Sequence, residues 1–319
     1  MNELLLAVIL FSLGLFIIIK GGDAFVDAAA WMSEVTGIPK LIVGATVISL
    51  ATTLPELFVS AIATKDGSIG IATGNAIGSV IANIGIGMSI GLIVIPMAIS
   101  RRSFAPKAFV MIIVTAALMI CGLDGNISLL DSIILLSLLA FYIYSNVKSA
   151  KEESMNIKEE ERPECNKKII TFRISQFVLG AAGIIIGAKL LVDNGQIIAS
   201  AVGISEKVIG LTVIAIGTSL PELVTAITSV IKKDAALSVG NIIGANIIDM
   251  AMILPVCSLI SGGTLEISRP TVFIDLPVSL ILMAIVVIPT IVHTRFKKWQ
   301  GWSILACYVA YLVYVTTTM

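Results

Sequence analysis

Charged residues are scarce in this chain. Asp, Glu, Lys and Arg make up 13% of its 319 residues, about half the share of roughly 25% found in a soluble domain. They lie in short islands between apolar runs of about 20 residues, the length that crosses a bilayer. The formal net charge is zero, so the charge balance gives no reason to propose a nucleic-acid partner. This composition predicts an integral membrane protein in contact with the lipid bilayer.

Cysteine and histidine, the usual ligands of zinc and soft metals, are also rare. His293 is the only histidine, and the four cysteines have no CxxC spacing: Cys121, Cys165, Cys257 and Cys307. A catalytic zinc centre needs three protein ligands, so we expect no such centre and no other bound cofactor. The sequence also lacks HExxH, a Ser/His pairing and a GxGD-type aspartate pair. We therefore expect a protein that is not an enzyme.

The apolar runs predict an all-α membrane fold with ten spans. The predicted ranges are 3–30, 38–63, 70–96, 104–122, 127–147, 172–201, 206–231, 236–260, 271–292 and 299–317. Residues 148–170 form the only long polar stretch, and Pro163 breaks any helix there. We expect a flexible linker at 148–170 between two five-span halves, residues 1–147 and 171–319.

Lysine and arginine in the loops predict the orientation, because cytoplasmic loops carry an excess of both. With the N-terminus outside, the outer loops hold only Lys65, Lys207 and Arg269. The cytoplasmic side then holds Lys40, Arg101, Arg102, Lys107, Lys148, Lys151, Lys158, Arg162, Lys167, Lys168, Arg173, Lys232, Lys233, Arg295, Lys297 and Lys298. This asymmetry predicts a multi-pass protein of the cell membrane with both termini outside and the 148–170 loop in the cytoplasm.

Three acids in the first and sixth spans lie near lysines of the same spans. They are Asp23, Asp27 and Asp193, and the lysines are Lys20 and Lys189. We interpret them as ion pairs at the membrane interface.

The two halves repeat each other. Residues 37–83 align without gaps with 203–249, and 16 of the 47 positions are identical. TTLPEL at 52–57 matches TSLPEL at 218–223, and GNAIGSVIAN at 74–83 matches GNIIGANIID at 240–249. Because each half has an odd number of predicted spans, the second half enters the membrane from the opposite side. Such inverted repeats are typical of secondary transporters, whose substrate site lies near the midplane between the repeats.

Each repeat carries one glutamate, Glu56 or Glu222, in the middle of an apolar span. An ionised carboxylate in hydrocarbon is costly unless it is paired, hydrated or bound to a cation. Neither span contains a lysine or arginine at that depth. A protonated glutamate held within the bundle explains one such residue alone, but not the repeated motif around it. The pattern therefore predicts a bound cation.

The proline before each glutamate predicts further oxygen ligands. Pro55 and Pro221 interrupt the helix hydrogen bonds, which predicts free carbonyl groups near Ser49 and Ala215. Irregular backbone at this depth is tolerated only beside a cavity or within protein. Hydroxyl groups three and four residues before each glutamate share its helix face; they belong to Thr52, Thr53, Thr218 and Ser219.

The second motif adds one amide, one acid and one hydroxyl. Asn83 and Asp249 occupy equivalent positions, and Ser79 lies four residues before Asn83. The resulting set contains only oxygen ligands, which hard cations such as calcium prefer. Three acids have enough charge for one divalent ion or several monovalent ions, which would compete for the same site. Glycines at four-residue spacing also predict close helix contacts; they are Gly74, Gly78, Gly240 and Gly244.

On GTSLPE at 217–222 and GNIIGANIID at 240–249, the chain resembles the cation/calcium exchanger superfamily, most closely its compact prokaryotic sodium/calcium exchangers. The resemblance covers nearly the whole chain by topology and about a third of it by motif. It implies that Glu56 and Glu222 are shared by calcium and sodium, the transported ions. It also implies that Thr52 and Thr218 join the calcium site and that Asn83 and Asp249 complete the middle position. Flanking sodium sites would use Thr53, Ser79, Ser219 and the carbonyl groups of Ser49 and Ala215.

One departure from the family pattern bears on sodium. Ala245 stands where a serine is expected, and where the first half has Ser79, so one flanking sodium site loses an oxygen ligand. The sequence therefore predicts a sodium/calcium antiporter working by alternating access, with a proton/calcium antiporter on the same fold as the alternative. Potassium-coupled relatives carry an acid where Asn83 stands, and an ion channel does not explain two paired broken helices. No obligatory protein partner is indicated, and the coupling ion, stoichiometry, affinity, oligomeric state and direction stay open.

Overall fold

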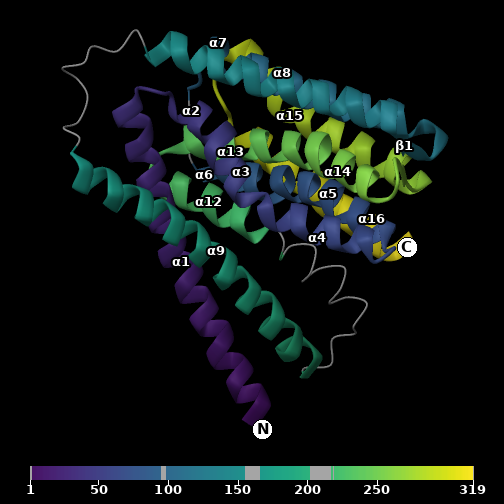
Figure 1. Cartoon of the computed structure of the whole chain (residues 1–319), viewed down its shortest axis with the longest axis horizontal. Coiled ribbons are helices and arrows are strands. Elements are labelled where there is room, and N and C mark those ends of the chain that lie inside the picture. Colours follow the sequence, from purple (N-terminus) through teal and green to yellow (C-terminus); the bar gives the residue numbers. More distant parts are fainter. Residues whose placement is uncertain (1, 95–97, 155–165, 202–216, 218, 319) are drawn as a thin grey trace.

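The structure is a computed structural model that describes residues 2–94, 98–154, 166–201, 217 and 219–318. Most of these residues are helical (Figure 1). In chain order the helices are α1 (Asn2–Thr36), α2 (Lys40–Val43), η1 (Gly44–Ile48), α3 (Ser49–Thr52), α4 (Leu54–Lys65), α5 (Ile69–Ala82), η2 (Asn83–Met88), α6 (Ser89–Val94), α7 (Arg101–Cys121), η3 (Gly122–Asp124), α8 (Leu129–Ser154), α9 (Lys167–Ala201), α12 (Leu220–Ile231), α13 (Ala235–Ile248), η6 (Asp249–Ile253), α14 (Leu254–Ile260), η7 (Thr271–Asp275), α15 (Leu276–His293) and α16 (Lys298–Thr318). Two short strands, β1 (Asn126–Ser128) and β2 (Thr264–Glu266), pair antiparallel.

The predicted all-α membrane fold is confirmed. In the described residues seven helices are long and apolar enough to cross a membrane, and the bent pair 40–52 and 54–65 makes an eighth if it is one span. The count of ten stays a prediction, because most of the first half of the seventh predicted span, 206–231, lies outside the described residues. Large apolar side chains such as Leu5, Phe16 and Phe58 are exposed on the surface, as expected for helices that face lipid.

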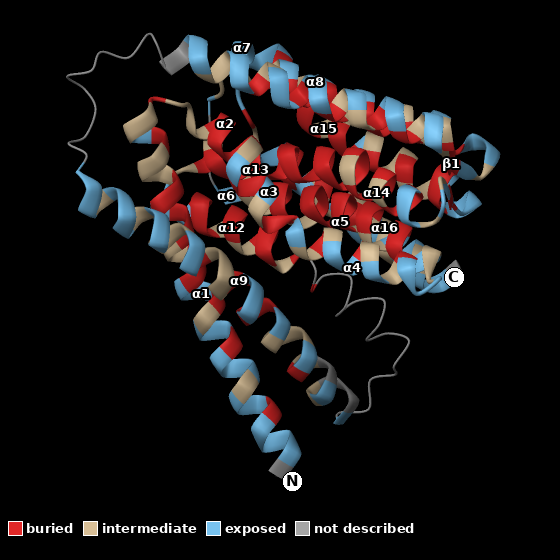
Figure 2. Cartoon of the chain, in the orientation of Figure 1, coloured by how far each residue is buried: buried red, intermediate tan, exposed pale blue. Residues whose placement is uncertain are grey.

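The buried core lies around α5, α13 and α14. Figure 2 shows buried residues concentrated in these helices and exposed residues along the outer ribbons. The core cluster includes Ile77, Ile84, Met111, Ile243 and Leu254. These side chains come from both halves of the chain, so neither half has a separate core.

The predicted helix breaks are present in both repeats. In the first, α3 ends at Thr52 and α4 begins at Leu54, with an angle of 41° between the two segments. In the second, α12 begins at Leu220 after Ser219. Thr53 has φ −83° and ψ −5°, and Ser219 has φ −84° and ψ 3°. Each proline then lies in the first turn of the following helix, where its missing N–H costs no hydrogen bond.

The α13 helix packs closely on the broken helix of the first half. A Cβ atom on Gly240 would lie 2.2 Å from the carbonyl oxygen of Leu41, and one on Gly244 would lie 2.4 Å from Ser49 Oγ. The predicted close contact is therefore confirmed for the second repeat. A Cβ atom on Gly74 or Gly78 would meet no described atom of another segment within 4 Å. The segment of the second repeat that would match the neighbours of α13 falls mostly in 206–216, outside the described residues.

Helices α1 and α9 lie side by side and extend away from the other helices (Figure 1). The predicted ion pairs within these helices are wrong for Asp23 and Asp27. Both acids contact Lys232 instead, at 3.6 Å and 2.7 Å. The reason is tertiary: α1 packs along α12, which brings its acids to the residue that follows α12.

Segments predicted to share one side of the membrane lie at the same end of the bundle. Residues from the starts of α2, α7 and α13 and from the end of α8 line one cavity. Helix α8 runs to Ser154 and α9 starts at Lys167. Both ends of the predicted 148–170 linker are therefore helical, and residues 155–165 lie outside the described residues. The direction of the bundle in the membrane stays a prediction.

The contact at Gly240 gives a test of this packing. We expect Gly240→Ala to lower the free energy of unfolding by about 1–3 kcal/mol, because its methyl group overlaps the Leu41 carbonyl. Thermal unfolding of the purified protein in detergent measures the change. Gly70→Ala is the matched control, since an added Cβ there would meet no described atom of another segment within 4 Å, and its repeat equivalent is already Ala236. Equal stability of the two variants would contradict the close α13 contact.

Candidate cation site

The residues predicted to bind a cation are buried. None of the described ones is more than 3% exposed: Glu56, Glu222, Asp249, Asn83, Thr52, Thr53, Ser79, Ser219 and Ser49. The carboxyl groups of Glu56, Glu222 and Asp249 lie close enough to interact electrostatically. Ala215 and Thr218 lie outside the described residues, so their predicted roles stay predictions.

Side-chain hydrogen bonds join the two halves at this point. Thr53 Oγ1 lies 3.3 Å from Glu222 Oε1, and Thr52 Oγ1 lies 3.3 Å from Asn241 Oδ1. Asn83 Nδ2 donates to Asn246 Oδ1 over 3.2 Å. Each bond has one partner in residues 1–147 and one in residues 171–319. The structure thus brings together the two motifs that the sequence repeats.

The carbonyl group of Ser49 is not free, contrary to the prediction. It accepts the Thr53 N–H at 3.0 Å and the Thr53 hydroxyl at 2.6 Å. The physical reason is the register of the break: Pro55 lacks the N–H that would reach the carbonyl four residues earlier, which is that of Ala51. The Thr52 hydroxyl also lies 3.4 Å from this carbonyl, so both hydroxyls would have to turn away for Ser49 to bind a cation through it.

Asn83 and Asp249, which the sequence places at equivalent positions, also share a local backbone feature that the sequence did not predict. Each is the first residue of a π-helical turn, η2 in the first half and η6 in the second. Single π turns within α-helices are rare and frequent at functional sites. The same local widening of the helix therefore begins at the equivalent residue of both repeats.

Many polar atoms in this region have no hydrogen-bond partner among the described residues. They include both carboxyl oxygens of Glu56, both of Asp249, Glu222 Oε2, Asn83 Oδ1, Ser79 Oγ and Ser219 Oγ. A buried polar group without a partner costs roughly 1–3 kcal/mol, and more when it is charged. A cluster of such oxygens has the chemistry of a cation site.

Among the described residues, no basic side chain forms an ion pair with the three acids, Glu56, Glu222 and Asp249. In the same part of the chain, no three His, Cys, Asp or Glu side chains are placed so that they alone hold a metal ion. A cation bound between these acids would therefore also need hydroxyl, amide or carbonyl oxygens.

Sequence reasoning missed several polar residues beside the acids. Asn241 and Asn246 make the inter-half bonds described above, and Asn75 donates to the Glu56 carbonyl at 3.3 Å. Thr225 and Ser229 follow Glu222 on α12 with buried, unpartnered hydroxyls. Asn75 and Asn241 were detectable, because both repeats carry asparagine at that position. Asn246 aligns with a valine, Val80, in the other repeat, so the alignment did not indicate a polar role for it.

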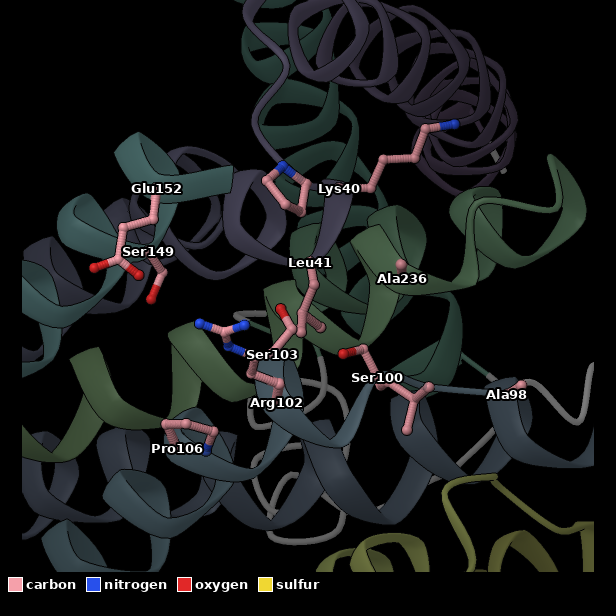
Figure 3. Close-up of a pocket in the computed structure, with 12 residues that line it drawn as sticks. Lys40, Leu41, Ala98, Ser100, Arg102, Ser103, Pro106, Ser149, Glu152 and Ala236 are labelled. Carbon is pink, nitrogen blue, oxygen red and sulfur yellow. The ribbon is translucent and has the colours of Figure 1, made fainter. Parts of the chain in front are cut away.

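An open cavity of about 610 Å³ lies apart from the acids, between the starts of α2, α7 and α13 and the end of α8. No predicted ligand lines it. Figure 3 shows Arg102 pointing toward Ser149 and Glu152, while the Lys40 side chain points away. Lys40 is ion-paired with Asp234. The cavity is thus a feature of one end of the bundle and not the candidate cation site.

Comparison with known proteins identifies the family. The model of the sodium/calcium exchanger protein family matches residues 6–148 and 172–317. The chain belongs to this family. It is 32% identical to an uncharacterized membrane protein of Methanocaldococcus jannaschii, over 96% of this chain and 97% of that one. The sodium/calcium exchanger MaX1 of Methanosarcina acetivorans is 26% identical over 94% and 96% of the two chains.

Solved structures agree with this assignment to the exchanger family. A structure of the sodium-calcium exchanger NCX_Mj soaked with Na⁺ and Sr²⁺ has a TM-score of 0.85 and 31% identity, covering 97% of this chain and 99% of that one. Another, soaked with Na⁺ without Ca²⁺, has a TM-score of 0.86. The family and these structures make cation/calcium exchange the activity class of this exchanger.

The Thr53 hydroxyl of this exchanger gives a test of the bond between the halves. We expect Thr53→Val to lower the free energy of unfolding by about 1–3 kcal/mol in cation-free buffer, because Glu222 loses its hydroxyl neighbour. Thr53→Ser keeps the hydroxyl and should be close to wild type. Thr46→Val is the control, since Thr46 bonds only the Ile42 carbonyl of its own segment. Thermal unfolding compares the three, and equal losses in Thr53→Val and Thr46→Val would refute the inter-half role.

Proposed function

We propose that this chain is a secondary active antiporter that exchanges sodium for calcium by alternating access at the three buried acids. The observation that carries the proposal is the set of unpartnered oxygens on Glu56, Glu222 and Asp249. They come from both halves, are almost fully buried, and have no basic partner among the described residues. Bound cations supply the missing positive charge.

The donor set explains why two kinds of ion compete. Calcium accepts six to eight oxygens in flexible geometry. The three carboxyl groups offer enough charge for one calcium ion or for two or more sodium ions, but not for both sets together. Glu56 and Glu222 would be shared by both ions, Thr52 and Thr218 would join the calcium site, and Thr53, Ser79 and Ser219 would serve sodium. Binding one ion therefore excludes the other, which couples their transport.

The proposed architecture is two inverted five-span repeats, residues 1–147 and 171–319. The 148–170 loop would lie in the cytoplasm and both termini outside the cell membrane. Three hydrogen bonds across the halves and the matching helix breaks support this arrangement, because an inverted-repeat transporter binds its substrate where the repeats face each other.

Charges at the two ends of the bundle support alternation between two states. The repeat extends into α1 and α9 at the same offset, since Asp27 matches Asp193 and Gly21 matches Gly187. Asp23 then corresponds to Lys189 and Lys232 to Asp66, so the charges are reversed. Lys232 contacts α1 through Asp27 at 2.7 Å. Lys189 and Asp66 form no ion pair, although both are described.

This asymmetry predicts that Lys189 and Asp66 form an ion pair in the second state, the one that opens to the other side of the membrane. In a variant without the four native cysteines, we expect Lys189→Cys with Asp66→Cys to be joined by a short bifunctional maleimide only under ion conditions that permit turnover. Asp27→Cys with Lys232→Cys is the control pair, already close in this structure. Gel mobility of the purified protein reads out the link. Failure of the first pair to link under every ionic condition would contradict alternation at these two ends.

Ala245 favours proton/calcium exchange as a second candidate. It is completely buried in α13, at the position where the first half has the unpartnered Ser79 hydroxyl. A proton binds a carboxylate directly and does not need that lost oxygen, whereas sodium would lose a ligand. The two candidates use the same acids and differ only in the coupling ion.

Calcium uptake into proteoliposomes distinguishes the candidates. With sodium inside and a calcium bath outside, we expect uptake by the wild type and loss of at least tenfold in Glu56→Gln and Glu222→Gln. Each substitution removes one negative charge while keeping the side-chain shape. The sodium ionophore monensin should abolish uptake by dissipating the gradient. Glu152→Gln, a change on the cavity at the end of α8, is the control and should transport normally.

Three outcomes separate the hypotheses. Sodium-driven uptake that both glutamine variants lose supports the proposed function. Uptake that follows only an outward proton gradient keeps the site but makes the protein a proton/calcium antiporter. If folded wild-type protein takes up no calcium under either gradient, the calcium assignment is wrong.

A further inference from the structure

A chain of three side chains leads from the cation site into the apolar core. Asn83 Nδ2 donates to Asn246 Oδ1 over 3.2 Å, and Asn246 Nδ2 donates to Met111 Sδ over 3.7 Å. All three residues are at most 1% exposed. The other end of the Asn83 amide, its Oδ1 atom, has no partner among the described residues. The chain of hydrogen bonds therefore runs from Asn83 in the first half through Asn246 in the second half to Met111 in α7 of the first half.

The hydrogen bonds of this chain are donated in one direction, and the Met111 sulfur determines which. A thioether sulfur accepts hydrogen bonds but has no hydrogen to donate. Asn246 must therefore point its NH₂ group at Met111 and its carbonyl oxygen at Asn83. That carbonyl oxygen can only accept a hydrogen bond, so Asn83 must present its NH₂ group to Asn246. The remaining atom of Asn83, Oδ1, then faces away from Asn246.

We propose that Met111, acting through Asn246, orients the Asn83 amide so that its oxygen faces the transported cation. Met111 and Asn246 are positioning residues, because neither is a ligand. The proposal deepens the sodium/calcium exchange proposed above and rests on it. Hydrogen-bond partners outside the first ligand shell commonly fix the orientation of ligands in this way.

Reversal of both amides shows why the direction matters. With Asn246 and Asn83 turned over, the Asn83 NH₂ group would face the three acids. It would donate to a carboxylate oxygen and repel a cation, so the empty site would be favoured over the bound one. Among these three side chains, only the Met111 sulfur distinguishes the two arrangements. The two asparagines can form the hydrogen bond between them in either orientation, because each amide has both a donor and an acceptor.

A matched pair of methionine variants tests the proposal. Met111→Leu keeps the volume and removes the acceptor, and we expect the calcium dissociation constant to rise about fivefold to tenfold, the size of one lost hydrogen bond. Met283→Leu is the control. Its sulfur accepts from Thr115 at 3.3 Å and not from the asparagine chain, so its calcium affinity should stay within twofold of wild type. Isothermal titration calorimetry of the detergent-purified exchanger gives both constants.

A second background separates orientation from packing. Asn83→Asp replaces the amide with a carboxylate, whose two oxygens are equivalent, so no wrong orientation remains. In that background Met111→Leu should change calcium affinity by less than twofold. Thermal unfolding without cations is measured alongside, and there Met111→Leu and Met283→Leu should be alike.

Three results would overturn the inference. Met111→Leu could bind calcium as the wild type does, both leucine variants could weaken binding equally, or the effect of Met111→Leu could persist in the Asn83→Asp background. The last two would assign Met111 a packing role. Failure of the proposed function is recognised separately, because the wild type itself would then show neither calcium binding nor sodium-driven uptake.

Discussion

The rest of this structure depends on one constraint: three carboxyl groups are buried with no basic partner among the residues that the structure describes. Glu56, Glu222 and Asp249 are each 1% exposed, and ionised acids at such depth are too costly to persist uncompensated. Lysine side chains would neutralise them permanently and leave a stable but inert core. The described groups around the acids are hydroxyls and amides, which carry no compensating charge. This missing charge is the electrostatic basis of the proposal that an exchangeable cation binds here.

The helix breaks and the small residues follow from that constraint. A continuous helix uses its backbone oxygens internally, so oxygens for a cation must come from side chains and from a break. Proline one residue before each glutamate places the break beside the acid. Gly240 and Gly244 leave no room for a methyl group between α13 and the broken helix. This close packing accompanies the hydrogen bond between Thr52 on the broken helix and Asn241 on α13.

The two halves share a backbone but not a full set of ligands. Ser49 and Ser79 in the first half correspond to Ala215 and Ala245 in the second, while the amide of Asn83 corresponds to the acid of Asp249. The first half thus supplies more neutral oxygens and the second half more charge. Positioning is divided unevenly as well: Asn246 supports Asn83, whereas its counterpart Val80 has no polar atom to offer Asp249. The repeat in the sequence therefore does not imply that the two halves supply equal sets of polar atoms.

The sequence by itself determined the membrane fold and the helix breaks, and it singled out the three buried acids of the proposed site. These follow from local rules: apolar run length, the missing N–H of proline, and polar residues repeated where hydrophobicity cannot explain them. Tertiary structure decided which residues meet. Lys232 forms an ion pair with Asp27 because α1 passes the end of α12. The Thr53 hydroxyl donates to the Ser49 carbonyl. Asn246 contacts Asn83 and Met111 across helices. Such contacts depend on how distant helices pack, and no spacing along one chain segment encodes that packing.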